Sequence, residues 1–366
     1  MHLTVPNKIS RSICLLALIA TGISCSDDRN LISMQVGLSR SVSKLPFVIA
    51  VDQGLYEKYG LELEIWMAEP EFDGVSRIGS STRAWIWRLT DYLTSRIEPL
   101  RSITGQLWKP DIRVSGANGR IVERATSAES PHQVSLAATD CVVRHHIVAR
   151  KGIERLEDLK GKRLGVSSLS ANTGFVALLL AERMGWDPIQ DISIIPNGHD
   201  IDALREGRVD AFVANERSYA AALQEGFPVL AATSTWGEPM AGNSVIVNAA
   251  WLEDPRNREV ARRFLQATIE GIALFHQDRE LVLEILARWH GITDRAFAET
   301  VYEAGRWIPR KPYPCYEGIM KAMEIYDSNE MRRYTPEDFY DDSLMRELDE
   351  SGFIDSLYAT VESRSP

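Results

Sequence analysis

The sequence predicts an α/β protein of two lobes, in which each lobe is a mostly parallel sheet flanked by helices. The chain has 366 residues, which at roughly 150 residues per domain suggests two domains. Short apolar strands and helices alternate over residues 162–232, which is typical of βαβ units in a parallel sheet. A similar pattern precedes residue 138 and resumes at 244. We therefore expect the second lobe to be inserted in the first, with chain crossings near 138–142 and 236–243.

The first lobe begins with a strand, a helix and a strand. We expect a strand over 33–36, a helix over Leu45–Tyr59 that ends at Gly60, and a strand over Leu61–Trp66. Asp254 and Pro255 form a favourable helix start, because a capping residue precedes a proline. The other elements expected are a mostly helical stretch over 72–107, strands over 111–115, 133–137 and 244–247, and helices from 255 onward.

The second lobe alternates strands and helices with short connections. The expected strands cover 163–167, 192–195, 209–213 and 228–231, and the expected helices cover 175–184, 201–205 and 216–224. Glycine follows each of these helices, as it often does at a helix end. The predicted boundaries are residues 31–138 plus 240–345 for lobe I, with C-terminal helices to 366, and residues 139–239 for lobe II.

Composition is that of a globular protein, with 45% apolar and 25% charged residues. It excludes intrinsic disorder, collagen and a disulfide scaffold. The net charge of −10 disfavours a general nucleic-acid binder, which needs the opposite sign. We therefore expect no nucleic-acid partner.

The N-terminus has the pattern of an export signal. Lys8 and Arg11 precede an apolar stretch over Ile13–Ala20, which is too short to span a bilayer, and small residues follow. We expect residues 1–24 to be a signal peptide, the alternative being a short buried helix. The box from Gly22 to Cys25 resembles that of bacterial lipoproteins, although leucine is usual where Gly22 stands. Cys25 is then lipidated and anchors the protein to a membrane; the alternative is simple cleavage and a free periplasmic protein. In either case the protein works in the periplasm or at the cell surface.

Three segments resemble the substrate-binding proteins of nitrate, sulfonate, taurine and thiamine-precursor ABC importers. They are Leu45–Glu64, Leu156–Val166 and Ala203–Ala211, and their order and spacing make the set specific. Residues 66–137 match less well. The resemblance implies a two-lobed periplasmic-binding-protein fold of type II that closes on a small solute. It also implies a monomer that delivers the solute to an ABC permease in the membrane and needs no cofactor.

Ligands of parallel α/β sheets bind beyond the carboxyl ends of the strands. Polar residues at these ends begin helices in both lobes, and a helix start attracts anions; plain helix capping is the alternative. A helix start with basic residues opposite it favours a small organic solute with a polar or anionic end. The candidate ligand-binding residues are Arg40, Ser41, Lys44, Ser168, Ser170, Asn172, Thr173, Asn215, Glu216, Tyr219, Trp236 and Asn243, and the candidate hinge residues are Thr139 and Asp140.

Aromatic and sulfur-containing residues leave two questions open. Four tryptophans of the first lobe either belong to the core or stack on a flat ligand: Trp66, Trp85, Trp87 and Trp108. Cys141 and Cys315 are far apart in the sequence. We expect two buried free cysteines, with a disulfide as the alternative.

Motifs of catalysis are missing from the sequence. It has no Walker A loop, no GxGxxG after a strand and no GxSxG elbow. His145 and His146 are adjacent and point to opposite faces of a strand, so they do not chelate one metal together. The run from Ser41 to Lys44 spells S-x-x-K without the partner motifs of serine acylases. We expect no enzyme and no metal site. The alternatives are a ligand-sensing lipoprotein that is not coupled to transport and, less favoured, an enzyme like the yeast-type pyrimidine synthase of thiamine synthesis, which shares the fold.

Overall fold

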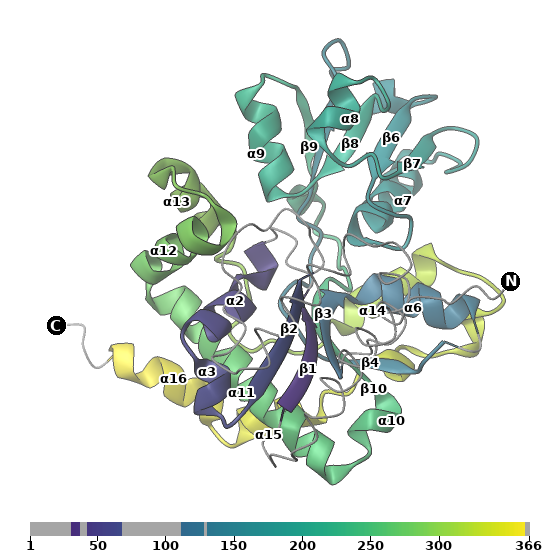
Figure 1. Ribbon diagram of the computed structural model, residues 1–366. Coiled ribbons are helices and arrows are strands. Elements are labelled where there is room, and N and C mark those ends of the chain that lie inside the picture. Colours follow the sequence, from purple (N-terminus) through teal and green to yellow (C-terminus); the bar gives the residue numbers. More distant parts are fainter. Residues whose placement is uncertain (1–30, 37–41, 68–110, 128–129, 363–366) are drawn as a thin grey trace, which may run out of the picture. The chain divides into compact units, whose positions relative to one another are not determined.

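Two five-stranded sheets organise the described part of the chain, residues 31–36, 42–67, 111–127 and 130–362 of a computed structural model (Figure 1). The first sheet has the order β2-β1-β3-β10-β4 and the second has the order β7-β6-β8-β5-β9. The strands are β1 (Leu31–Val36), β2 (Glu62–Met67), β3 (Ile112–Gly116), β4 (Gln133–Ala138), β5 (His146–Ala149), β6 (Arg163–Val166), β7 (Ser193–Pro196), β8 (Ala211–Ala214), β9 (Val229–Ala232) and β10 (Asn243–Asn248).

Each sheet contains one strand that runs against the others. In the first sheet β1 is parallel to β2 and β3, whereas β10 is antiparallel to β3 and β4. In the second sheet β6 is parallel to β7 and β8, whereas β5 is antiparallel to β8 and β9. The reversed strand is in each case the first one after a crossing between the sheets. The prediction of an α/β fold with two mostly parallel sheets is therefore confirmed.

Helices cover both sheets. In the second sheet they are α7 (Asn172–Met184), α8 (Ile201–Arg205) and α9 (Glu216–Gln224), with the short turns η2 (Leu156–Leu159) and η3 (Thr233–Trp236). The helices and turns of the rest of the chain are η1 (Val42–Lys44), α2 (Leu45–Asp52), α3 (Leu55–Lys58), α6 (Ala117–Thr126), α10 (Ala249–Leu252), α11 (Pro255–Gln277), α12 (Arg279–His290), α13 (Arg295–Ala304), α14 (Tyr316–Ile325), η4 (Met331–Arg333), η5 (Pro336–Phe339), α15 (Ser343–Glu350) and α16 (Phe353–Glu362). None of these described helices combines the length and the apolar character needed to cross a membrane.

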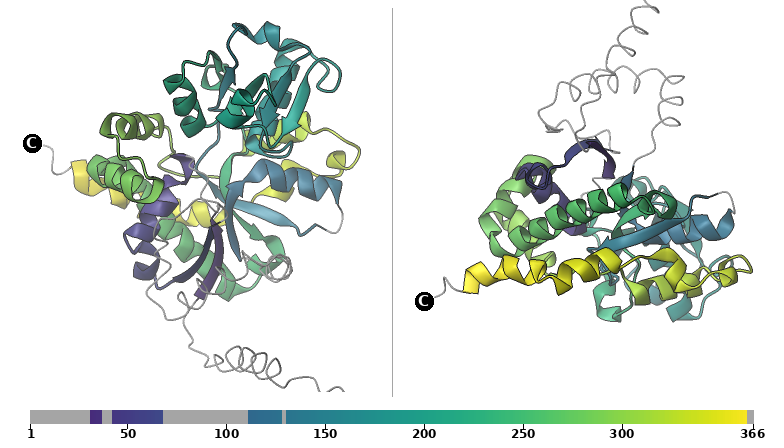
Figure 2. Two further views of the ribbon diagram at one scale, coloured as in Figure 1. Left: turned by 45° about the horizontal axis from the view of Figure 1, so that its top comes forward. Right: turned by 90° about the horizontal axis from the view of Figure 1, so that it is seen from below.

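The long helix α11 packs on α2 and also on α16, which lies beside it in Figure 2. Asp254 caps α11 by accepting the N–H of Arg256 at 2.8 Å. Gly271 allows the close approach to α2, because a Cβ there would lie 2.4 Å from the carbonyl oxygen of Pro46. Buried side chains such as Phe264 and Ile272 then fill the core between the helices and the first sheet.

The helix predicted over Leu45–Tyr59 is two helices, so this prediction is wrong in its continuity. Helix α2 ends at Asp52 and α3 begins at Leu55. Gly54 separates them with φ of 64°, a left-handed conformation that breaks the helical path and that glycine adopts without a Cβ clash. Apolar residues continue on both sides of the break, which is why the periodicity alone did not reveal it.

The hydrophobic core continues from the second sheet into helices encoded far away in the sequence. Phe175 and Leu179 of α7 belong to the same buried cluster as Ile121 of α6 and Ile319 of α14. At the edge of this cluster Lys321 of α14 forms an ion pair with Glu182 of α7 at 2.9 Å. Helix α14 therefore packs on α7, which covers the inserted sheet, although α14 follows the return crossing in the sequence.

The two crossings run side by side as an antiparallel ribbon, which we call the crossing ribbon (residues 139–143 and 238–243). Backbone hydrogen bonds join the N–H of Thr139 to the carbonyl of Asn243 at 2.9 Å and the N–H of Gly242 to the carbonyl of Asp140 at 3.1 Å. A Cβ on Gly242 would lie 2.3 Å from that carbonyl oxygen, so only glycine fits there. The ribbon brings both connections between the sheets to one place.

A disulfide joins Cys141 to Cys315, with a Cα–Cα distance of 5.3 Å. The expectation of two free cysteines is therefore wrong. Cys141 lies in the crossing ribbon and Cys315 is the residue before α14, so the fold brings together positions 174 residues apart in the sequence. The bond ties the crossing ribbon to the start of α14.

Candidate functional site

The start of α2 is fastened to the crossing ribbon by buried polar groups. The hydroxyl of Thr139 donates to the carbonyl oxygen of Ser43 at 2.6 Å. The side-chain amide of Asn243 donates to the hydroxyl of Ser43. Lys44, the last residue of η1, is also buried. The predicted residues Lys44, Thr139 and Asn243 thus come together where the carboxyl end of β4 meets the beginning of α2.

Two buried carboxyl groups lie at this junction. Asp140 is in the crossing ribbon and is 6% exposed. Glu216 begins α9, and its carboxyl lies near enough to the backbone N–H of Val42, in the segment before α2, for this group to lower its pKa. Burial, and then the nearby Glu216, raise the pKa of Asp140 to about 8, while Arg144 opposes this shift. Burial also raises the pKa of Glu216.

Several polar atoms at this junction are buried without a hydrogen-bond partner. Within the described ranges these atoms include Asp140 Oδ1, Glu216 Oε2, Arg144 Nε and His146 Nδ1. We call these four residues the crossing site. Buried polar atoms in proteins are nearly always paired, so a concentration of unpaired ones indicates a place where an outside group binds.

Aromatic rings border the crossing site. The ring of His146 stacks on Tyr219 of α9 with centroids 3.7 Å apart and planes at 10°. The guanidinium of Arg144 lies 4.5 Å from the ring centroid of Trp307. His146 pairs in register with Ala214, the last residue of β8, which explains why it lies near the start of α9. The site therefore combines charged groups with flat apolar surfaces.

The start of α7 is close to the start of α6. Asn172 Oδ1 accepts a hydrogen bond from Asn118 Nδ2 at 3.3 Å, and it would lie 2.7 Å from a Cβ on Gly116. Asn118 is fully buried, and its own Oδ1 has no partner among the described residues. The N-cap of α7 is Ala171, without a side-chain cap, so the alternative of capping by Ser170 or Asn172 is wrong.

Other predicted residues have structural contacts of their own. The Thr173 hydroxyl accepts the N–H of Ser167 at 2.9 Å and so closes the loop that holds the partly buried Ser168 and Ser170. Asn215 caps α9 by accepting the N–H of Ser218 at 3.0 Å. The guanidinium of Arg183 lies 5.1 Å from the ring centroid of Trp236, which packs against the core of the second sheet. Arg40, Ser41, Cys25, residues 1–24, the stretch 72–107 and Trp85, Trp87 and Trp108 lie outside the described residues, as does the side chain of Trp66.

Sequence reasoning missed Arg144, His146 and Trp307. The signal for the first two was present, because a run of titratable residues, Arg144-His145-His146, follows a predicted crossing and precedes an apolar strand. His145 has a structural role in this run. Burial lowers the pKa of its imidazole to about 4, and its backbone N–H donates to the hydroxyl of Thr233 at 2.7 Å. Trp307 carried no such signal, because it reaches the site from a helical region far along the chain.

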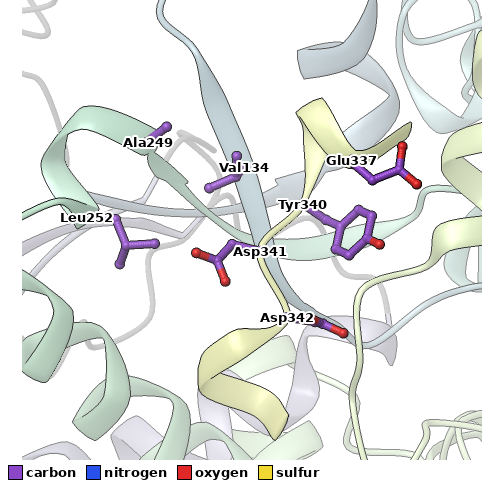
Figure 3. Close-up of a pocket in the computed structure, with 7 residues that line it drawn as sticks. All are labelled: Val134, Ala249, Leu252, Glu337, Tyr340, Asp341 and Asp342. Atoms are coloured by element: carbon purple, nitrogen blue, oxygen red, sulfur yellow. The ribbon is translucent and has the colours of Figure 1, made fainter. Parts of the chain in front are cut away.

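A separate surface pocket of about 340 Å³ lies next to β4 and η5 (Figure 3). Its lining includes the acidic residues Glu337, Asp341 and Asp342. Asp342 forms an ion pair with Arg346 at 2.6 Å, and Asp341 accepts the N–H of Ser343 at 2.9 Å. None of the predicted ligand-binding residues lines this pocket, and two of its three carboxylates already have partners within the chain. Among the residues the structure covers, no group of three or more histidine, cysteine or acidic side chains is placed to hold a metal ion.

Two sheets of the same strand order joined by two crossings define the fold of the periplasmic solute-binding proteins. The alkanesulfonate-binding protein SsuA from Xanthomonas axonopodis pv. citri bound to MOPS has a TM-score of 0.58 and 16% identity, over 87% of this chain and 97% of its own. The periplasmic aliphatic sulphonate binding protein SsuA from Escherichia coli has a TM-score of 0.56 and 17% identity, over 87% and 91%. The desulfurization enzyme DSZB has a TM-score of 0.55 and 11% identity, over 86% and 98%.

In sequence, residues 141–280 match the family described as NMT1/THI5 like. The matched segment covers the five strands of the second sheet, the return crossing, β10 and α11. The comparison with curated proteins found no match. The resemblance predicted from the sequence is confirmed by the family match and by the fold of the SsuA proteins.

Proposed function

We propose that the protein is the extracytoplasmic solute-binding subunit of an ABC-type importer. It captures a small organic solute with a polar or anionic end and delivers it to the permease in the membrane. The observation that carries this proposal is the set of unpaired buried polar atoms in the crossing site, between the two sheets. The match to the NMT1/THI5-like family and the titles of the SsuA structures, which name sulfonates, support the same function.

Residues of both sheets contribute to the proposed site. Lys44 and Asn243 belong to the first sheet and its helices, and Asn172, Glu216 and Tyr219 belong to helices of the second. A solute that contacts both groups favours the closed arrangement of the lobes over the open one, which is how hinge closure is coupled to binding.

The polar or anionic end of the solute binds near the start of α7. This helix has 13 residues and no side-chain cap, so its first N–H groups and the positive end of its dipole are available to an anion. Lys44 of η1 adds positive charge on the side of the first sheet. The rings of Tyr219 and Trp307 supply the flat surfaces for the body of the solute.

The same proposal includes the lobe boundaries, the hinge residues, the export signal and the oligomeric state. Lobe I comprises residues 31–138 and 240–345, with the C-terminal helices, and lobe II comprises residues 139–239. Thr139 and Asp140 act as hinge residues within the crossing ribbon. Residues 1–24 direct export, and Cys25 carries a lipid or follows a simple cleavage site. The working form is a monomer.

A catalytic function is the second candidate, because the desulfurization enzyme DSZB has the same fold. The fold alone therefore does not separate binding from catalysis. A sensor that binds the solute without import makes the same contacts and differs only in the absence of a permease.

Calorimetry against sulfonates, nitrate, taurine, pyrimidines and aromatic acids tests the proposal, with mass spectrometry of each solute afterwards. We expect one class to bind with one solute per chain and to be recovered unchanged. Chemical conversion of a solute would establish the catalytic candidate instead. Failure of every class to bind would refute the proposal of a solute-binding subunit of this type.

A further inference from the structure

We propose that the solute carries a protonated nitrogen, an ammonium or amidinium group, which binds between the carboxylates of Asp140 and Glu216. This inference rests on the proposed function and names a chemical group that the solute must have. It adds to the polar or anionic end expected near α7 and assigns the crossing site to a different part of the same molecule.

The first argument is that two buried carboxyl oxygens at this site accept no hydrogen bond. Glu216 Oε2 is buried without a hydrogen-bond partner, and so is Asp140 Oδ1 among the described residues. An ionised carboxylate is only an acceptor. Two such oxygens from separate elements require a donor-rich group, and an ammonium group supplies three N–H donors in a small volume.

The second argument is charge. Asp140 is influenced by Glu216 and by Arg144, and Arg144 is the nearest positive group that acts on it. Lys44 of η1 is a second cation at the junction, so the charges there balance only when both carboxylates are ionised. The guanidinium also lies over the ring of Trp307, and its Nε does not reach a hydrogen-bond acceptor in the described residues. An ammonium group between the two carboxylates is attracted by both of them, whereas an anionic group at the same place would be repelled by both.

The third argument is the state of the site before the solute arrives. Burial, and then the nearby Glu216, raise the pKa of Asp140 to about 8, and burial raises the pKa of Glu216, so Asp140 retains a proton in the empty site at neutral pH. A bound ammonium group replaces this proton, which passes to the buffer. The other titratable or charged groups of the surrounding elements are Lys44 of η1, Arg144, His145 and His146 at the start of β5, and Tyr219 of α9. Burial lowers the pKa of both histidines, so they stay neutral. Binding should therefore release protons and should strengthen as the pH rises from 6 to 8.

The test uses solute pairs that differ only in the amine. The pairs are benzylamine and benzyl alcohol, 1,4-diaminobutane and 1,4-butanediol, and 2-aminoethanesulfonate and ethanesulfonate, measured by calorimetry in two buffers of different ionisation enthalpy. We expect the amine of at least one pair to bind about tenfold or more tightly than its partner, with proton release. Glu216→Gln and Asp140→Asn should each remove most of this preference. Glu216→Asp keeps the charge and should retain part of it.

Glu157→Gln is the matched control, because Glu157 is an exposed residue of the second lobe that pairs with Arg155. It should leave the amine preference unchanged. Thermal melting curves confirm that each variant is folded. Binding of both members of a pair with equal affinity would overturn the inference while leaving the proposed function intact. An amine preference that survives in both Glu216→Gln and Asp140→Asn would also overturn it. If no solute in this set or in the wider panel binds the folded wild type, the proposed function fails and the inference fails with it.

Discussion

Replacing both Cys141 and Cys315 with serine should lower the stability of the protein without changing its folded structure. The crossing ribbon places Cys141 by backbone hydrogen bonds, and the bond from Met240 N–H to the Cys141 carbonyl is 3.0 Å long. Cys315 directly precedes α14, which packs on α6 and α7. Both positions are therefore held by contacts other than the disulfide, so the main effect of the bond is on the unfolded chain.

The magnitude follows from the loop that the disulfide closes. The two cysteines are 174 residues apart, and the chain-entropy relation gives roughly 5 kcal/mol for a loop of that length. Measured losses are commonly smaller, so we expect the double variant to lose about 2–5 kcal/mol of unfolding free energy. Its unfolded chain is less compact, so the dependence of unfolding on denaturant should become steeper.

Guanidinium unfolding of the oxidised wild type, the reduced wild type and the double variant measures this effect. The reduced wild type should match the double variant, which separates loss of the bond from loss of the sulfur atoms. Equal unfolding midpoints for all three proteins would refute the entropic argument. Alkylation found at Cys141 and Cys315 by peptide mapping of the unfolded, unreduced protein would refute the disulfide itself.

Three further predictions concern the crossing ribbon, an ion pair and the proposed site. Gly242→Ala should lower stability by about 1–3 kcal/mol, because its Cβ would lie 2.3 Å from the carbonyl oxygen of Asp140; an unchanged melting temperature would contradict this contact. Asp210→Asn should cost about 1–3 kcal/mol at pH 7, since hydrogen bonds from the Arg163 side chain and backbone lower the pKa of Asp210 to about 2. That contribution is present above the ordinary carboxyl pKa and is lost as the pH falls towards 2. Urea unfolding should therefore show a large difference in unfolding free energy between the wild type and Asp210→Asn at pH 7, and a small difference at pH 2. Equal differences at the two pH values would argue against this contribution. Asn172→Ala should weaken solute binding by about 0.5–3 kcal/mol in calorimetry, and unchanged affinity would place the solute elsewhere.

The fold was predictable where its signals are local. Strands β6 to β9 and the helices between them follow apolar periodicity with turn residues at the ends, and Gly185 terminates α7 with φ of 65° as its position suggested. The return of β10 to the first sheet was also predictable, because the α/β pattern resumes at 244. The order of the strands within each sheet follows from tertiary packing, and no local pattern encodes it.

The candidate site was only partly predictable for the same reason. Lys44, Asn172 and Glu216 follow or adjoin strand ends, so a rule about parallel sheets was sufficient to select them. The disulfide and the approach of Trp307 to Arg144 depend on contacts between distant segments. Spacing in the sequence does not show which distant segments will meet, so these features required the structure.

The position of the reversed strands has a mechanical consequence. Each crossing leads into a strand that has neighbours on both sides, β5 between β8 and β9 and β10 between β3 and β4. A force that pulls the lobes apart therefore loads two hydrogen-bonded ladders in shear at each end, instead of peeling one edge strand away. The crossing ribbon is thus anchored at each end in the interior of a sheet, where a strand cannot be detached without breaking hydrogen bonds on both of its sides.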